Sequence, residues 1–251
     1  MIVRAAVAFR QFISTEDRLE WLRDQLAWRL FRYHLRRENV RNAAFDAAHG
    51  IDTAAEVDLQ MAGLTRAQAD RGNTVYRVFW EANFAAILDD LNVDHREFTF
   101  IDIGSGKAKL LLLASHYPFR RIVGVELAPL LHEIAIRNID IYRPPRRQCN
   151  DISSVLGDAL EYELPDGPLI CLMVNPFDRT TVGRVIRRIA DRIRTSPEPV
   201  LVIYANMRRI DEIRSVFDDP AGLEVMVRRR NHIILGNDAA VRRNVVRSER
   251  A

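Results

Sequence analysis

The chain has 251 residues, of which 48% are hydrophobic and 28% are charged, and this is enough for one α/β domain with a substantial core plus a helical extension. Its net charge of +3 is too small to indicate a nucleic-acid partner by itself. Two cysteines, Cys149 and Cys171, exclude a disulfide framework and lack the spacing of a metal site, so we expect a reduced, cytoplasmic protein without a metal ion.

Residues 1–13 lack the features of a signal peptide. Arg4 and Arg10 interrupt this stretch, which has no apolar core and no small-residue cleavage site. No apolar run in the chain approaches the roughly 18 residues that would span a bilayer, so no membrane partner is expected.

A long helix is predicted from Ser14 to about Glu38. Apolar residues recur there at intervals of three or four and form one stripe, made of Leu19, Leu22, Leu26, Leu30 and Tyr33. Arginines surround the stripe and leave three interpretations open: a basic arm for an acidic substrate or nucleic acid, a dimerisation helix, or a helix packed on the catalytic domain with a solvated face. Acidic residues are interleaved with the arginines, and this favours the last interpretation.

Two segments precede the first strand of the predicted sheet. Phe45–Thr53 is expected to be a loop-like link, where His49 is a candidate general base because its unperturbed pKa is near 6.5. A lone loop histidine is more often exposed or hydrogen-bonded locally. Residues 72–92 are expected to form a loop and then a helix, with these residues facing inward: Val75, Phe79, Ala82, Ala86 and Leu91.

The central segment of the chain is residues 98–109, with the sequence FTFIDIGSGKAK. Aromatic and β-branched residues predict a buried strand, Gly104 and Gly106 break it, and Lys107–His116 is expected to be a helix. Such a turn lets a ligand approach the backbone and directs helix amides toward that ligand. A dinucleotide usually requires a third glycine, and because Lys109 stands at that position, NAD-dependent chemistry is disfavoured.

Lys107 and Lys109 are the only lysines of the chain, and every other cationic residue is arginine. A compositional bias toward arginine accounts for this, with both lysines as ordinary residues of the first helical turn.

Polar residues suited to a nucleoside follow the next two predicted strands. The strand Arg121–Val125 ends at Glu126, whose carboxylate can accept hydrogen bonds from both ribose hydroxyls. A third strand ends at residues 156–158, where Asp158 is placed to accept a hydrogen bond from an adenine amino group.

Strands alternate with helices through the rest of the chain, which implies a parallel sheet. The other predicted elements are a fourth strand at Leu169–Val174, a fifth at Pro199–Ala205, helices at Pro129–Tyr142, Asp178–Thr195 and Arg208–Asp218, a hairpin of Leu223–Val227 and Ile233–Leu235, and a charged, frayed tail from Asn237 to Ala251.

Together these segments resemble the class I S-adenosylmethionine-dependent methyltransferases. The resemblance covers about residues 72–236, where FTFIDIGSGKAK, RRIVGVELAP, LGDA and VNPFD stand at the first four motifs of that superfamily. It is nearest to a group of mostly uncharacterised bacterial methyltransferases that pair GSGKG with GVE and NPF, and more distant to Dot1-type lysine methyltransferases. The resemblance implies an α/β fold with a Rossmann-like seven-stranded sheet, mostly parallel with the last strand antiparallel, and helices on both faces.

The same resemblance implies S-adenosylmethionine as the cofactor. Asp102 and the two loop glycines would surround its methionine part, Glu126 would hold the ribose, and Asp158 would contact the adenine. The related bacterial group often has a similar glycine-aspartate-threonine stretch at residues 50–53, which implies that this segment folds over the pocket. The implied cofactor-binding residues are Asp102, Gly104, Ser105, Gly106, Glu126, Leu127, Asp158, Ala159 and Asn175.

The chain departs from the related group at two places. The third glycine of GSGKG is Ala108, which adds a methyl group beside the cofactor. A Tyr-x-Pro-Thr element that lines the cofactor site in the group has no proline here, only Asn73, Thr74 and Tyr76. Any of the three could contact the methionine carboxylate, and a helix cap plus a core tyrosine is an equal alternative.

The segment Asn175-Pro176-Phe177 is similar to the Asn-Pro-Pro-Tyr motif of amino-group methyltransferases. In those enzymes the asparagine oxygen and a proline carbonyl accept hydrogens from the target nitrogen. Methyl transfer from a sulfonium depends mainly on positioning the nucleophile, so we expect Asn175 and Phe177 to be the catalytic residues. The match is incomplete because Asp178 stands at the aromatic position; Asp178 is a weaker candidate for orienting an amine. An Asn-Pro pair also serves simply to end a strand.

The sequence therefore predicts a helical extension over residues 1–71, a methyltransferase domain over 72–236 and a tail over 237–251. The expected function is methylation of a nitrogen acceptor on a protein or small molecule. An oxygen or carbon methyltransferase of a small metabolite, and a non-catalytic binding or regulatory protein, are the alternatives. No recognition motif supports a nucleic-acid partner, and dimerisation through the N-terminal helix stays open.

Overall fold

The computed structural model describes residues 15–72, 75–79, 81–194, 198–205, 216–217 and 222–246. Contacts along the chain divide it into two compact units, Met1–Ala44 and Phe45–Ala251. Within the described ranges, no helix is long and apolar enough to cross a membrane.

Helix α2 spans Thr15–His49, so its predicted end near Glu38 is wrong. Residues 39–49 contain several alanines and neither glycine nor proline, and the helix therefore continues until Gly50, whose φ is +68°. Phe45–His49 is consequently helical and not part of a loop.

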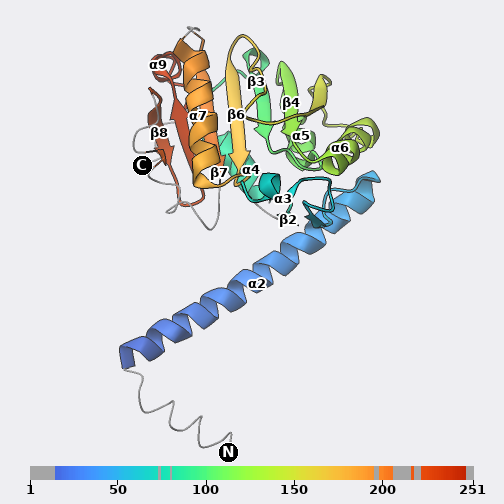
Figure 1. Cartoon of the computed structure of the whole chain (residues 1–251), viewed down its shortest axis with the longest axis vertical. Helices are drawn as coiled ribbons and strands as arrows, with labels where there is room; N and C mark the ends of the chain where they lie inside the picture. The colour runs from blue at the N-terminus through green and yellow to red at the C-terminus, as the bar shows by residue number, and fades with distance from the viewer. Residues whose placement is uncertain are drawn as a thin grey trace, which may run out of the picture. The chain divides into compact units, whose positions relative to one another are not determined.

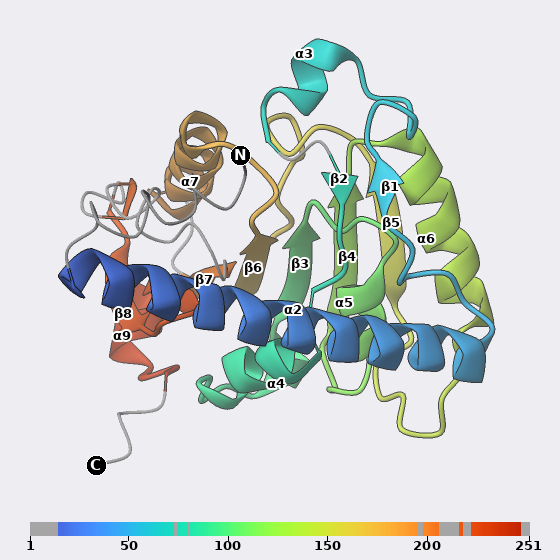
Figure 2. The ribbon, with the colours of Figure 1, turned by 90° about the horizontal axis from the view of Figure 1, so that it is seen from below.

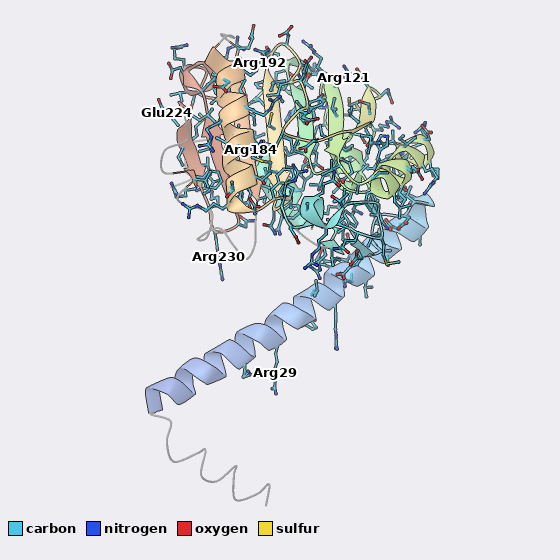
Figure 3. All side chains as sticks on the ribbon, in the orientation of Figure 1. Arg29, Arg121, Arg184, Arg192, Glu224 and Arg230 are labelled. Carbon is cyan, nitrogen blue, oxygen red and sulfur yellow. The ribbon has the colours of Figure 1, made fainter. Side chains whose placement is uncertain are left out.

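Large apolar side chains lie on the surface of α2 at intervals of seven residues. Leu26, Tyr33 and Val40 are 59%, 55% and 69% exposed, and Arg29 projects from the same helix (Figure 3). A spacing of seven keeps side chains on one side of a helix, as in coiled coils. Such a face suits the dimerisation alternative, which stays a prediction.

The Phe45–Ala251 unit is built on a seven-stranded sheet with the order β5-β4-β3-β6-β7-β9-β8 (Figure 1). Strands β3 to β7 pair in parallel, and β9 is antiparallel to both of its neighbours. This confirms the predicted Rossmann-like sheet and its final hairpin. The strands are β3 Thr99–Ile103, β4 Arg121–Glu126, β5 Ile152–Leu156, β6 Leu169–Val174, β7 Val200–Ala205, β8 Glu224–Arg228 and β9 His232–Gly236.

Helices cover both faces of this sheet (Figure 2). Successive side chains of a strand point to opposite faces. Accordingly, Phe100 and Leu172 join the core with α4, α5 and α6, whereas Ile101 and Met173 join the core with α7. The helices are α4 Glu81–Asp89, α5 Lys109–Ala114, α6 Pro129–Ile141, α7 Arg179–Arg194 and α9 Asp238–Arg242, with a 3-10 turn at His95–Glu97.

The inward face predicted for α4 is wrong in part. Phe84, Ile87 and Leu88 are buried, whereas Ala82 and Ala86 are exposed. Both sets follow a helical spacing, and the set with larger apolar side chains is buried because it removes more apolar surface from water.

The C-terminal residues also differ from the prediction. Residues 238–242, expected to fray, form α9, and Asn237 caps that helix by accepting a hydrogen bond from the Ala240 amide at 3.0 Å. Val245 and Val246 are buried after it. Most of the helix predicted at 208–218 lies outside the described residues.

The segment from Phe45 to Phe79, here called the cap, contains the end of α2 and otherwise only short elements within its described residues. They are β1 Val57–Asp58, α3 Arg66–Ala69 and β2 Val75–Tyr76, with β1 antiparallel to β2. The side chains of Val57, Leu64 and Tyr76 pack against Ala128 and Leu131 at the start of α6. The cap is thus attached to the carboxyl edge of the parallel strands.

Candidate cofactor pocket

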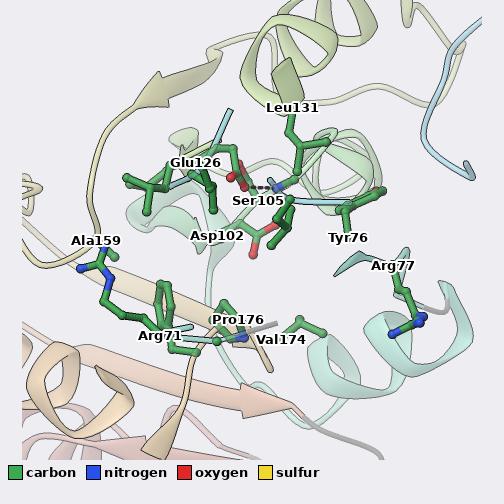
Figure 4. A pocket seen from close by; sticks show the side chains of 18 of the residues that line it. Arg71, Tyr76, Arg77, Asp102, Ser105, Glu126, Leu131, Ala159, Val174 and Pro176 are labelled. Carbon is green, nitrogen blue, oxygen red and sulfur yellow. Dashed lines mark hydrogen bonds between the residues drawn. The ribbon is translucent and has the colours of Figure 1, made fainter. Parts of the chain in front are cut away.

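The carboxyl ends of β3, β4, β5 and β6 meet along one edge of the sheet, and a pocket lies there between the edge and the cap. Ligands of open α/β sheets bind at this edge. Figure 4 shows Asp102, Glu126 and Ser105 together in the pocket, with Tyr76 contributed by the cap. The predicted residues that line it are Asp102, Gly104, Ser105, Gly106, Glu126, Leu127, Asp158, Ala159 and Phe177.

The glycine loop after β3 turns sharply next to β4. The amides of Gly104 and Ser105 both donate hydrogen bonds to the Val125 carbonyl, at 2.8 and 3.2 Å. Gly104 and Gly106 have φ values of +83° and +56°, which side chains disfavour. A Cβ at Gly106 would also overlap the ring of Tyr76, so the cap lies directly against the loop.

Ala108 affects the backbone rather than the pocket. It is fully buried, does not line the pocket and has a φ of +71° at the N-terminus of α5. A residue with a Cβ is strained in this conformation. The methyl group of Ala108 therefore lies outside the pocket lining, and the turn at Ala108 shortens the predicted helix to Lys109–Ala114.

Glu126 closes the pocket from the end of β4. One carboxylate oxygen accepts a hydrogen bond from the Gly106 amide at 2.7 Å, and the other accepts one from the Ala128 amide at 2.8 Å. Burial raises the pKa of Glu126, while these amide donors act in the opposite direction. The Leu127 amide also stabilises the carboxylate, and of its roughly four acceptor positions at least one remains for a ligand hydroxyl.

Asp102 lies beside Glu126 and is 2% exposed. Burial, together with the nearby charge of Glu126, raises the pKa of Asp102 to about 8. A cation brought into this part of the pocket would favour the ionised form of both carboxyls.

Asp158 forms an ion pair with a residue of the cap. Its Oδ2 accepts a hydrogen bond from Arg71 at 2.8 Å, and its Oδ1 accepts one from the Leu160 amide at 2.9 Å. Arg71 itself lines the pocket (Figure 4). The sequence interpretation missed Arg71, because nothing in the pattern of residues 54–71 pointed to the edge of the sheet.

Asn175 stands at the end of β6, but it does not line the pocket. Its φ is +47°, and its Oδ1 accepts a hydrogen bond from the Tyr204 hydroxyl at 3.2 Å. Pro176 and Phe177 do line the pocket. Asp178, a candidate for orienting an amine, is exposed and instead accepts a hydrogen bond from the Thr181 amide in the first turn of α7.

Hydrogen bonds hold the cap together and connect it to the glycine loop. The Tyr76 hydroxyl donates to the Thr53 carbonyl at 3.0 Å, and Lys107 pairs with Asp52 at 2.8 Å. Asn73 and Thr74, the other candidates for the methionine carboxylate, lie outside the described residues. His49 packs against Tyr142 and does not line the pocket, so its position offers no support for a general base.

Both lysines are buried, which corrects their interpretation as ordinary first-turn residues. Lys107 is 1% exposed and Lys109 is 2% exposed. Lys109 lines the pocket, and its Nζ lies 3.1 Å from the centre of the Phe45 ring. Burial lowers the pKa of Lys109 to about 8, against the attraction of Asp46 and Glu81.

Two buried polar atoms of the pocket have no hydrogen-bond partner in the described part of the chain. They are the Ser105 hydroxyl oxygen and the Lys109 ammonium nitrogen. The same ranges contain no group of three or more His, Cys, Asp or Glu residues that could hold a metal ion. Cys149 and Cys171 are both buried, free thiols. The unpartnered atoms fit a polar organic ligand.

No protein-family model and no curated protein sequence matches this chain. Similar folds occur among solved methyltransferase structures. The mitomycin 7-O-methyltransferase MmcR is 21% identical with a TM-score of 0.43, and the match covers 62% of this chain and 52% of that one. The chain thus spans about half the length of MmcR.

Two further methyltransferases have a similar fold. The precorrin-6y C5,15-methyltransferase from Geobacter metallireducens GS-15 is 16% identical with a TM-score of 0.47, over 63% of this chain and 89% of that one. The N,N-8-amino-8-demethyl-D-riboflavin dimethyltransferase RosA from Streptomyces davawensis is 17% identical with a TM-score of 0.45, over 62% and 53%. These likenesses concern the fold, and the acceptors named for the three enzymes differ.

Proposed function

We propose that this protein is an S-adenosylmethionine-dependent methyltransferase that acts on a nitrogen acceptor of a protein or small molecule. The observation that carries the proposal is Glu126, a buried carboxylate that lines the pocket, accepts a hydrogen bond from the Gly106 amide of the glycine loop and keeps acceptor capacity for a ribose hydroxyl. A cytoplasmic location belongs to the same proposal, in keeping with the free thiols of Cys149 and Cys171.

The residues around the pocket fit this cofactor. Asp102 and Lys109 offer charges of opposite sign to its amino-acid part, and Gly104 and Gly106 line the same pocket. Asp158 would accept a hydrogen bond from the adenine amino group once its bond with Arg71 is shared or broken. When bound, the cofactor supplies a methyl group on a positively charged sulfur.

We assign recognition of the methyl acceptor to the residues that follow β6. Tyr204 donates a hydrogen bond to the Asn175 Oδ1 and so fixes the orientation of that amide at the end of the strand. Pro176 and Phe177 form the pocket wall beside it. These groups would hold an amine in line with the donated methyl group, which is the main requirement of such a displacement.

Calorimetric titration with S-adenosylmethionine and S-adenosylhomocysteine tests the cofactor assignment. The wild type is expected to bind both at micromolar concentration, and Glu126→Ala is expected to bind at least tenfold more weakly, or about 1.4 kcal/mol. Glu161→Ala is the matched control, because Glu161 is exposed and does not line the pocket. No binding to folded wild-type protein would rule out the methyltransferase assignment.

Two other functions have specific observations in their favour. Asn175 does not line the pocket, which suits an oxygen or carbon methyltransferase of a small metabolite in which Asn175 only shapes the site. The Arg71 bond to Asp158 suits a non-catalytic regulatory protein with a closed adenine site. Mass analysis of methylated products, with the modified atom located, separates the nitrogen, oxygen and carbon alternatives; binding without turnover supports the regulatory one.

A further inference from the structure

Three cationic side chains line the pocket within the described residues, and only one has no carboxylate partner. Arg71 pairs with Asp158 at 2.8 Å, and Arg77 pairs with Glu56 at 3.0 Å. Lys109 has no hydrogen-bond partner for its Nζ. A buried ammonium without partners is costly, so its presence calls for a reason.

The surroundings of Lys109 hold the ammonium in place without neutralising it. The Phe45 ring faces the Nζ at 3.1 Å, which is a cation–π contact. Asp46 and Glu81 attract it electrostatically. The carboxylate of Asp46 is already used by the Thr53 amide, the Thr53 hydroxyl and the Ala54 amide, at 2.6, 2.6 and 2.7 Å. The Nζ therefore keeps donors for a ligand.

Asp102 gives the same pocket a buried carboxyl group. A ligand that carries one ammonium and one carboxylate would match Asp102 and Lys109 together. This combination is the free end of an α-amino acid. A nucleoside without that end would leave both buried groups uncompensated.

We propose that Lys109 binds the carboxylate of an α-amino-acid moiety, so that the pocket selects S-adenosylmethionine and S-adenosylhomocysteine over nucleosides that lack this moiety. The proposal rests on the proposed function of the site. It makes Lys109 a specificity-determining residue, and it makes Phe45 the residue that positions the ammonium.

The test compares two ligands on three proteins by calorimetry. The ligands are S-adenosylhomocysteine and 5′-methylthioadenosine, which share the thioether and the nucleoside but differ in the amino-acid group. The proteins are the wild type, Lys109→Met and Arg77→Met. Arg77 is the matched control because it is a cation of the pocket rim that is already paired and is 62% exposed.

Lys109→Met is expected to weaken S-adenosylhomocysteine binding at least tenfold, since a charge-assisted hydrogen bond in a buried site is lost. Binding of 5′-methylthioadenosine is expected to change less than threefold. Arg77→Met is expected to change neither ligand more than threefold. Lys109→Gln, which is also uncharged, gives the same comparison if the methionine variant does not fold.

The dependence on pH supplies a second readout. The ratio of S-adenosylhomocysteine affinities, wild type over Lys109→Met, is expected to fall as pH rises from 7 to 9.5, because only the protonated amine attracts a carboxylate. The groups that face Lys109 are Asp46, Glu81 and the Phe45 ring, and the variant leaves all three unchanged.

Different outcomes identify different errors. If the folded wild type binds neither ligand, the proposed function fails, and the role of Lys109 fails with it. If the wild type binds both and Lys109→Met binds S-adenosylhomocysteine equally well, only the role of Lys109 is overturned. An equal loss of both ligands in Lys109→Met, or loss of selectivity in Arg77→Met, overturns it as well.

Discussion

Asp102 and Lys109 show how burial acts on single charges of opposite sign. Burial raises the pKa of Asp102 to about 8 and lowers that of Lys109 to about 8. Both shifts favour the neutral side chain, because a charge loses its hydration when it is buried. In the free protein, the ionised form of each group therefore lowers the free energy of unfolding.

Asp102→Asn should remove a stability loss that appears as pH rises. The folded pKa of Asp102 lies above its unfolded value of about 3.9, so the folded state binds more protons between about pH 4 and pH 8. The free energy of unfolding of the wild type falls across this window. At pH 8.5 the variant is expected to be more stable by on the order of 2 kcal/mol. Urea denaturation at pH 5, 7 and 8.5 measures the difference, and a constant difference would contradict the prediction.

Lys109→Met should stabilise the free protein near neutral pH. The folded pKa of Lys109 lies below its unfolded value, so the unfolded state binds more protons between about pH 8 and 10.4 and the stability of the wild type rises there. Below pH 8 the variant is expected to be more stable by on the order of 2 kcal/mol, and the gap should close toward pH 10. Denaturation at pH 7 and 10 tests this; a less stable variant at pH 7 would show that the contact with Phe45 outweighs burial.

At the scale of elements, the cap and the glycine loop form one packed structure. Tyr76 covers Gly106 and donates to Thr53, while Asp52 pairs with Lys107 beside the same loop. A ligand in the pocket would contact both elements. Mutations in the loop are therefore expected to act on the cap.

Gly106→Ala should destabilise the protein by about 1–3 kcal/mol. The new methyl group would overlap the Tyr76 ring, and a φ of +56° strains any residue with a Cβ. Gly157→Ala is the control, because Gly157 lines the same pocket but has no atom within 4 Å of its Cβ position. It is expected to change stability by less than about 0.5 kcal/mol. Equal effects of both substitutions in chemical denaturation would exclude the Tyr76 contact as the cause.

Some elements could be predicted from the sequence and others could not, for physical reasons. The strand at 99–103, the glycine turn and Glu126 follow from apolar runs, turn residues and the order of the elements. Arg71 and Lys109 line the pocket only because the cap folds over it, and the short elements of the cap have no periodic pattern from which this could be predicted. The face of α4 was ambiguous because two sets of apolar residues share its spacing. The positive φ of Ala108 could not be predicted, because alanine rarely adopts this conformation.

At the scale of the whole molecule, ligand binding is coupled to unfolding. A ligand that binds only the folded state stabilises it by about 2.7 kcal/mol at one hundred times its Kd. For a chain of this size we expect S-adenosylhomocysteine to raise the Tm by roughly 5–10 °C at that concentration. Differential scanning calorimetry measures the shift, and Glu126→Ala at the same ligand concentration is expected to show a smaller one. An equal shift in both proteins would place the ligand elsewhere.

The burial of both lysines has a practical consequence for proteolysis. Lys107 and Lys109 are the only lysines in the sequence, and both lie under the cap. A lysine-specific endoprotease therefore has no accessible cleavage site until the glycine loop opens. The rate of cleavage next to Lys107 and Lys109 therefore measures how often the glycine loop opens. A ligand that binds in the pocket should lower the cleavage rate as its occupancy rises, because it stabilises the packed state of the loop and the cap.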